Sequence, residues 1–287
     1  MRFSYIFIII ACLDGFNQFP DVKELPDFRE TVVEYFHECS KLSDQIARLM
    51  AKGLGVATQD ADPFLDDLQQ QHSSYLRLNY YPPCHDHPNH NHDIHKVEED
   101  ISPLGISPHK DAGFLTVLIQ DDECHSLQAL LEDPVDGDRW ISVQPIPGAL
   151  TINTGDMAQI WSNGKYKAPL HRVLTAPTKK RYSAPFFYNP GYDTFVAPAT
   201  TRTSTSAIGA THKYHPLLWG YFRAVRFAGD FTDLGVEIQI DDYEMARDKS
   251  IHLDRQQAFY DENWASVPFD VDRYKLLLEK YPEETSK

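Results

Sequence analysis

The feature that most constrains the fold is a long run of strand signals, which begins near Tyr75 and continues to about Phe195. Its clearest segment, residues 114–120, is rich in β-branched and apolar side chains, as a buried strand is. Gly113 on one side and Asp121 on the other bound this segment. The sequence therefore predicts that short strands make up the middle of the chain.

Helical patterns flank the strand run on both sides. Before it, apolar residues recur at helical spacing up to Gly53, which is expected in the C-cap position. A second, short helix is expected to begin at Asp62-Pro63. After the strands, residues 215–227 indicate a helix or a packed turn, and residues 273–280 indicate a final amphipathic helix. The expected apolar face of the first helix consists of Phe28, Val32, Phe36, Cys39, Leu42, Ile46 and Leu49.

The length and the order of these elements predict one structural domain. Helices on both sides of short antiparallel strands predict a mainly β fold with flanking helices (α+β). Its core is expected to be a double-stranded β-helix, or jelly roll, with the site in the barrel mouth. We expect an atypical N-terminal segment (1–15), a helical part (16–73), the jelly-roll core (74–200) and a C-terminal helical and loop region (201–287) that packs on the core.

Charge and cysteine content limit the partners and the compartment. The chain has 42 acidic and 27 basic residues, a net charge of −15, and no basic stripe interleaved with aromatic residues. Nucleic acid is therefore not an expected partner. Four cysteines, at positions 12, 39, 84 and 124, lack C-x-x-C spacing and are too sparse for a disulfide framework. We expect a cytoplasmic monomer that acts on a small molecule without a membrane partner.

Three residues that are far apart in sequence have the side chains of one metal site. His109 and Asp111 precede the strand at 114–120, and residues i and i+2 of an extended chain point to the same face. His171 begins the next extended stretch, after the hairpin turn signal Asn163-Gly164. Two imidazoles and one carboxylate form the facial triad of a non-haem Fe(II) oxygenase, which leaves half of an octahedral iron open for co-substrate and O2. Taken alone, His171 is better explained as a core histidine bonded to a backbone carbonyl.

A candidate anion receptor follows the second histidine. Arg181 and Ser183 begin another strand and share a face of it. A guanidinium beside a hydroxyl is the expected receptor for the distal carboxylate of a small dicarboxylic acid.

Three other segments have a similar appearance and are discounted. His252-Leu-Asp254 has no downstream histidine and is expected on a solvated helix face. Arg202-Thr-Ser204 lies in a Ser/Thr-rich run that is expected to be a loop. Residues 85–95 contain five histidines, but nothing there fixes ligand geometry, so we expect a flexible surface loop near the site entrance.

Together these residues resemble the 2-oxoglutarate and Fe(II)-dependent dioxygenases of the isopenicillin N synthase-like family. The resemblance runs from about residue 16 to about residue 243. Besides the His-x-Asp, distal His and Arg-x-Ser motifs, the matching segments are Arg77-Leu-Asn-Tyr-Tyr-Pro82, Gly113-Phe-Leu-Thr-Val-Leu, Leu127-Gln-Ala-Leu, Asn153-Thr-Gly-Asp156 and Trp161-Ser-Asn-Gly164. Several unrelated spacings agree at once, which makes the resemblance specific.

The resemblance implies a role for each candidate residue. The implied iron ligands and catalytic residues are His109, Asp111 and His171, and the implied receptor for the C5 carboxylate of 2-oxoglutarate is Arg181 with Ser183. Asn79 and Tyr81 are similar to a pair that helps place the co-substrate, and Phe187 lies where relatives place an aromatic ring against the substrate. For these last three residues, ordinary packing inside the barrel stays open as an alternative.

The implied activity couples oxidative decarboxylation of 2-oxoglutarate by Fe(II) and O2 to oxidation of a small organic metabolite. Hydroxylation with release of succinate and CO2 is the expected reaction, in specialised or nucleobase metabolism. One alternative is a 2-oxoglutarate-independent oxidase similar to isopenicillin N synthase or aminocyclopropane carboxylate oxidase. Others are a catalytically silent binding protein and a zinc hydrolase, although the hydrolase gives Arg181 and Ser183 no role.

The first residues of the chain depart from the family pattern. Residues 1–13 have the basic start and apolar run of a signal peptide and are too short to span a bilayer. Acting as a signal peptide, they would make the protein secreted. The family also places a module of helices and strands ahead of the segment that begins near Gly15. We expect a shortened or altered start rather than secretion.

Overall fold

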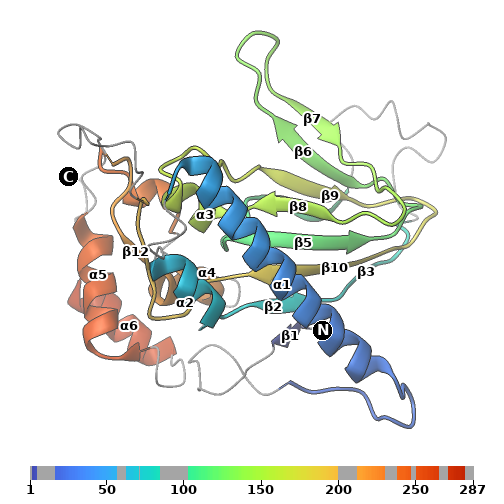
Figure 1. The fold of residues 1–287 in the computed structure, drawn as a ribbon, viewed down its shortest axis with the longest axis horizontal. Helices are drawn as coiled ribbons and strands as arrows, with labels where there is room; N and C mark the ends of the chain where they lie inside the picture. The colour runs from blue at the N-terminus through green and yellow to red at the C-terminus, as the bar shows by residue number, and fades with distance from the viewer. Residues whose placement is uncertain are drawn as a thin grey trace.

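The computed structural model describes residues 2–4, 17–56, 63–70, 72–84, 103–199, 212–229, 238–246, 250–264 and 271–281. Two antiparallel sheets stand one above the other, and helices cover the larger sheet (Figure 1). This arrangement confirms the predicted mainly β class with flanking helices. Among the described strands the two sheets are not hydrogen-bonded to each other, so the space between them takes the place of the expected barrel mouth.

The larger sheet has six strands in the order β1-β2-β10-β5-β8, and β3 also pairs with β10. Its strands are β1 (Arg2–Ser4), β2 (Tyr75–Arg77), β3 (Asn79–Tyr81), β5 (Leu115–Gln120), β8 (Thr151–Thr154) and β10 (Arg181–Tyr188). In the register of β3 and β10, Arg181 lies opposite Tyr81 and Ser183 lies opposite Asn79. Four candidate site residues thus come from two neighbouring strands.

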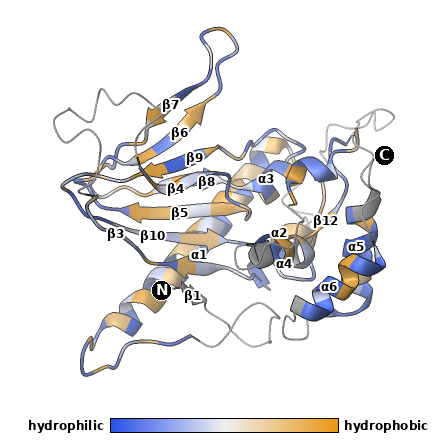
Figure 2. Ribbon diagram, turned by 180° about the vertical axis from the view of Figure 1, so that it is seen from behind, coloured by the Kyte–Doolittle hydropathy of each residue, from blue (hydrophilic) through white to orange (hydrophobic). Residues whose placement is uncertain are grey.

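The smaller sheet has four strands in the order β4-β9-β6-β7. They are β4 (Leu104–His109), β9 (His171–Leu174), β6 (Leu127–Leu131) and β7 (Arg139–Ser142), and Figure 2 shows them from behind. In the pairing of β4 with β9, His109 lies directly opposite His171. Two short strands, β11 (Phe195–Val196) and β12 (Leu217–Leu218), form a separate pair.

The long helix α1 (Phe28–Leu54) crosses the outer face of the larger sheet (Figure 1). Its buried residues are Phe36, Cys39, Ser43, Ala47 and Ala51, so small side chains let the helix lie close to the strands. Part of the predicted apolar face was wrong, because Leu49 is 65 % exposed.

The predicted C-cap of α1 was also wrong. Gly53 lies inside the helix, and Gly55, with φ of 75°, is the C-cap. A Cβ atom at Gly53 would lie 2.8 Å from the Tyr166 hydroxyl, so this glycine permits close packing rather than a turn.

Helix α2 (Pro63–Gln70) begins at the expected proline, and α6 (Val271–Lys280) confirms the final helix. The segment predicted at 215–227 contains β12 and then α4 (Trp219–Gly229). The remaining helices are α3 (Asp156–Trp161), the short 3-10 helix η2 (Ile240–Tyr243) and α5 (Ser250–Asp261). None of the helices within the described residues has the length and apolar character needed to cross a membrane.

Two further predictions were wrong in detail. Asn163-Gly164 does not join two strands but ends α3, because the Gly164 N–H donates to the Gln159 carbonyl. The His252 side chain is buried at 3 % exposure and does not lie on a solvated face. Arg202-Thr-Ser204, the histidine-rich residues 85–95 and most of residues 1–15 lie outside the described part of the chain.

Candidate functional site

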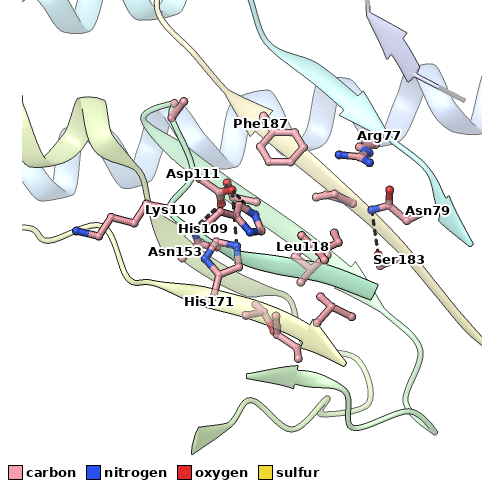
Figure 3. A pocket seen from close by; sticks show the side chains of 18 of the residues that line it. Arg77, Asn79, His109, Lys110, Asp111, Leu118, Asn153, His171, Ser183 and Phe187 are labelled. Carbon is pink, nitrogen blue, oxygen red and sulfur yellow. Dashed lines mark hydrogen bonds and ion pairs between the residues drawn. The ribbon is translucent and has the colours of Figure 1, made fainter. Parts of the chain in front are cut away.

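A pocket of about 350 Å³ lies between the two sheets. Every candidate site residue lines it: His109, Asp111, His171, Arg181, Ser183, Asn79, Tyr81 and Phe187. The histidines come from the smaller sheet, and the arginine and serine come from the larger one. Figure 3 shows the three predicted metal ligands together and Asn79 beside Ser183 in the same pocket.

The predicted metal ligands converge on one point. Asp111 Oδ1 lies 3.7 Å from His109 Nε2 and 3.7 Å from His171 Nε2. One ligand atom from each of the three residues lies within 4.8 Å of the others. Cross-strand pairing brings the histidines together, since their ring centroids are 4.3 Å apart.

Backbone carbonyls orient both imidazoles. His109 Nδ1 lies 2.8 Å from the Ser107 carbonyl oxygen, and His171 Nδ1 lies 3.1 Å from that of Pro169. A carbonyl only accepts, so each Nδ1 carries a proton, and in a neutral imidazole Nε2 then presents a lone pair to its neighbours. Burial, followed by the neighbouring His171, lowers the pKa of His109 below its ordinary value and favours the neutral form that binds metals.

Within the described part of the chain, the Asp111 carboxylate accepts side-chain hydrogen bonds through one of its two oxygens. Its Oδ2 accepts hydrogen bonds from Thr116 Oγ1 at 2.6 Å and Asn153 Nδ2 at 2.8 Å. The other oxygen, Oδ1, is the one that faces the two histidines. Such outer partners fix the orientation of metal ligands and their basicity.

The backbone around Asp111 explains the segment Asn153-Thr-Gly-Asp156. The Asp156 N–H donates to the Asp111 carbonyl at 2.8 Å, at the start of α3. A Cβ atom at Gly155 would clash with the backbone of Gly113 and lie 2.8 Å from the Asp111 carbonyl. Asn153 therefore orients the carboxylate, Gly155 permits the close approach, and Asp156 anchors the main chain.

The donor set fits Fe(II). Two neutral imidazoles and one carboxylate on one side of a point are the ligands of non-haem iron oxygenases, and the positions opposite them stay open for other ligands. The three residues that would hold the iron line one pocket together with Arg181.

Arg181 is a buried cation that forms no ion pair among the described residues. Its side chain is 2 % exposed, and Nη1 and Nη2 donate to Ser183 Oγ at 3.3 Å and Gln120 Oε1 at 2.8 Å. Its Nε is buried without a hydrogen-bond partner in the described part of the chain. Burial lowers the pKa of this guanidinium. A buried charge needs compensation, so this residue is arranged to receive an anion.

Asn79, Tyr81 and Phe187 line the pocket as well. Asn79 Nδ2 donates to Ser183 Oγ at 3.3 Å, and the Arg181 guanidinium lies 5.1 Å from the centroid of the Tyr81 ring. Phe187 stacks on Tyr75 at a centroid distance of 4.7 Å.

Several residues that line the pocket or support its lining were not singled out from sequence. Thr116 and Gln120 hold Asp111 and Arg181, respectively. The signal was present, since both are polar and lie on the same face of a strand that is otherwise apolar. Arg77 and Arg223 also line the pocket, and they come from β2 and α4.

Comparison with known proteins agrees with this geometry. Residues 72–190 match the family described as the 2OG-Fe(II) oxygenase superfamily. "Jasmonate-induced oxygenase 2" from Arabidopsis thaliana is 35 % identical over 204 residues, which cover 71 % of this chain and 49 % of that protein. A "1-aminocyclopropane-1-carboxylate oxidase" from Musa acuminata is 37 % identical over 199 residues, which cover 69 % of this chain and 58 % of that protein. The chain thus spans about half the length of the curated relatives it matches.

Solved structures are also similar. JOX2 in complex with 2OG, Fe and JA superposes with a TM-score of 0.56 and 35 % identity, over 69 % of this chain and 52 % of that one. A full-length Neurospora crassa protein in complex with alpha-KG and thymine gives a TM-score of 0.59 and 27 % identity, over 77 % of this chain and 64 % of that one. The predicted family is confirmed for this part of the chain, since residues 72–190 form a domain of the 2OG-Fe(II) oxygenase superfamily.

Proposed function

We propose that this protein is an Fe(II)- and 2-oxoglutarate-dependent dioxygenase that hydroxylates a small organic metabolite. The observation that carries the proposal is the buried Arg181 guanidinium, which forms no ion pair among the described residues and lines the same pocket as the metal ligands. A dicarboxylic 2-oxo acid fits this pocket, since one end can reach the metal while the other carboxylate pairs with the arginine. The similar solved structures that contain 2OG support the same assignment.

In this proposal each residue has one task. His109, Asp111 and His171 hold Fe(II), and Thr116 and Asn153 keep the carboxylate turned toward it. Iron and 2-oxoglutarate, when bound with O2, supply the oxidising power and yield succinate and CO2.

The remaining roles concern the two organic molecules. Arg181 and Ser183 bind the far carboxylate, while Asn79 and Tyr81 position the co-substrate beside them. Phe187 contacts the substrate on the side of Tyr75. The walls of the pocket exclude water and orient the two molecules relative to each other.

An oxidase that does not consume 2-oxoglutarate is the second candidate, because the Musa acuminata relative is an aminocyclopropane carboxylate oxidase. The test is formation of succinate by the purified protein with Fe(II), O2 and labelled 2-oxoglutarate. We expect succinate that requires added 2-oxoglutarate. Consumption of O2 without succinate would instead support the oxidase.

The role of Arg181 is tested separately. Arg181→Ala is expected to weaken 2-oxoglutarate binding by about 2–4 kcal/mol, the scale for removing one partner of a desolvated charge pair. Arg139→Gln, on the exposed strand β7, is a control that removes the same charge outside the pocket. Wild-type affinity in Arg181→Ala would remove the co-substrate assignment.

We further propose that the chain acts as a cytoplasmic monomer and that residues 74–200 form the catalytic core. Free cysteines at positions 39, 84 and 124 support a reducing compartment, where Fe(II) also persists. Gel filtration tests the monomer, and mass spectrometry of the native N-terminus tests the location. A mature protein that begins near Asp14 would contradict the cytoplasmic assignment.

A further inference from the structure

The pocket between the sheets is strongly cationic. Its lining contains the side chains of Arg77, Lys110, Arg181, Arg223 and Arg226, and among the described residues Asp111 is the one carboxylate in it. The protein as a whole has a net charge of −15, so the local charge of the pocket is opposite in sign to the net charge of the chain. Cations gathered in a pocket attract anionic ligands, both on approach and in the bound state.

Of these five cations, one has a proposed role, one contacts two other residues and one points away from the metal ligands. Arg181 receives the far carboxylate of 2-oxoglutarate in the proposed function. Arg226 lies 3.8 Å from Asp156 Oδ2 and donates to Gln239 Oε1 at 2.8 Å. Lys110 points away from the metal ligands (Figure 3). The two remaining cations are Arg77 and Arg223.

These two arginines flank an aromatic pair. Arg77 shares a strand face with Tyr75, since the two are i and i+2 in β2, and Figure 3 shows Arg77 beside Phe187. The Arg223 guanidinium, from α4, lies 5.0 Å from the centroid of the Tyr75 ring. Tyr75 in turn stacks on Phe187 at 4.7 Å. Cationic groups thus reach one apolar surface from a strand and from a helix.

Arg77 has no hydrogen-bond or ion-pair partner among the described residues, although it is only partly exposed. It lies two residues before Asn79 on the pocket side of the chain, near the place proposed for the organic substrate. A guanidinium binds a carboxylate through two parallel N–H groups, which gives orientation as well as affinity.

We infer that the organic substrate is a carboxylic acid whose carboxylate is bound by Arg77 and Arg223. Its apolar body lies against Phe187 and Tyr75, which directs a C–H bond toward the metal ligands. This inference rests on the proposed function, because the substrate site is defined relative to bound iron and 2-oxoglutarate. It specifies a class of substrate that the fold leaves open.

The test is isothermal calorimetry on protein loaded with Fe(II) and 2-oxoglutarate under argon. The probes are acids paired with their neutral amides, namely phenylacetate with phenylacetamide and hexanoate with hexanamide. We expect acids to bind at least about 30-fold more tightly than their amides, as for loss of a charge-assisted contact. Amides that bind as well as their acids, or a panel in which no acid is preferred, would overturn the inference.

Variants locate the effect within the pocket. Arg77→Gln and Arg223→Gln are each expected to weaken the preferred acid at least about 30-fold. The control Arg139→Gln is expected to bind it as the wild type does, because Arg139 lies outside the pocket. Thermal unfolding of each variant shows whether it is folded. Arg77→Lys and Arg223→Lys keep the charge but remove the two parallel N–H groups of the guanidinium. Unchanged acid affinity in folded Arg77→Gln and Arg223→Gln would overturn the assignment, as would a larger loss for 2-oxoglutarate than for the acid.

A second readout distinguishes this inference from the proposed function. Succinate formation from 2-oxoglutarate alone tests the proposed function and needs no organic acid. Formation of succinate by a protein that shows no preference for acids would contradict the inference but not the proposed function. Binding of acids without formation of succinate would contradict the proposed function, while the anion site at the two arginines would still be supported.

Discussion

The two sheets that enclose the pocket differ in how well they are supported. The six-stranded sheet has helix α1 on its outer face, where Val117 and Phe186 are fully buried. Among the described residues of the four-stranded sheet, Leu127 and Val173 are buried in a small cluster with Leu118, and Ile106 packs partly buried against it. Its exposed apolar residues include Leu104, Leu131 and Ile141, at 38–44 % exposure, and its β6–β7 hairpin projects from the molecule (Figure 1).

The two sheets contribute different residues to the site. The proposed anchor for the co-substrate, Arg181, lies on the well-packed sheet, whereas His109 and His171 lie on the sheet with the smaller core. The two histidines lie on neighbouring strands, so a bound metal ties β4 to β9. We therefore expect the metal to stabilise the smaller sheet as well as to serve the chemistry, because a ligand that binds only the native state adds to its stability.

The largest effect is expected from losing a ligand of the iron. Asp111→Ala and His171→Ala should each reduce Fe(II) affinity by more than the 10- to 100-fold typical of supporting residues, and should abolish turnover. Titration with Fe(II) under argon measures this. His125→Ala, an exposed histidine outside the pocket lining, serves as the control. Retained activity in either variant would remove the triad assignment.

A matched pair of valines tests the difference between the sheets directly. Val117→Ala, under α1, is expected to cost about 2–3 kcal/mol, since it leaves a cavity in a closed core. Val173→Ala, on the pocket wall, is expected to cost about 1 kcal/mol because the open pocket already borders the site. Urea unfolding of the metal-free protein measures both. Equal costs would show that the smaller sheet is as well supported as the larger one.

A smaller effect is expected where the larger sheet supports the metal ligand. Asn153→Ala removes the 2.8 Å hydrogen bond to Asp111 Oδ2 and should weaken Fe(II) about 10- to 100-fold. Thr154→Val is the neighbouring control, since the Thr154 hydroxyl donates to the Lys167 carbonyl rather than to the site. A loss of Fe(II) affinity in the control equal to that in Asn153→Ala would contradict the assigned role.

The smallest expected effect is a local one. Metal binding should slow backbone hydrogen exchange in β4 and β9 and leave β5 and β10 nearly unchanged, because those strands are already held by α1. Exchange measured by mass spectrometry with and without Zn²⁺ or Fe(II) detects it. Uniform protection of both sheets would contradict the comparison.

Much of the fold and the site was accessible from sequence because strand periodicity is local. The pairs His109 with Asp111 and Arg181 with Ser183 follow from the two-residue repeat and do line one pocket. The end of α1 was misplaced because two glycines compete locally, and only contact with Tyr166 distinguishes them.

Features that depend on tertiary contact were missed. The burial of His252 cannot be read from neighbouring charges, because distant elements cover it. Arg77 and Arg223 become a pair only when β2 and α4 meet at the same pocket, and no spacing in the sequence encodes that meeting.

The proposed iron site is sensitive to substitution of Gly155, although glycine is the smallest residue. The residue touches no proposed ligand atom, yet one additional carbon atom there would collide with the Gly113 main chain and crowd that of Asp111. A single methyl group there would force the main chain that carries Asp111 to shift. Natural or engineered variants of this chain can be sorted at that position before any assay, because only hydrogen fits there.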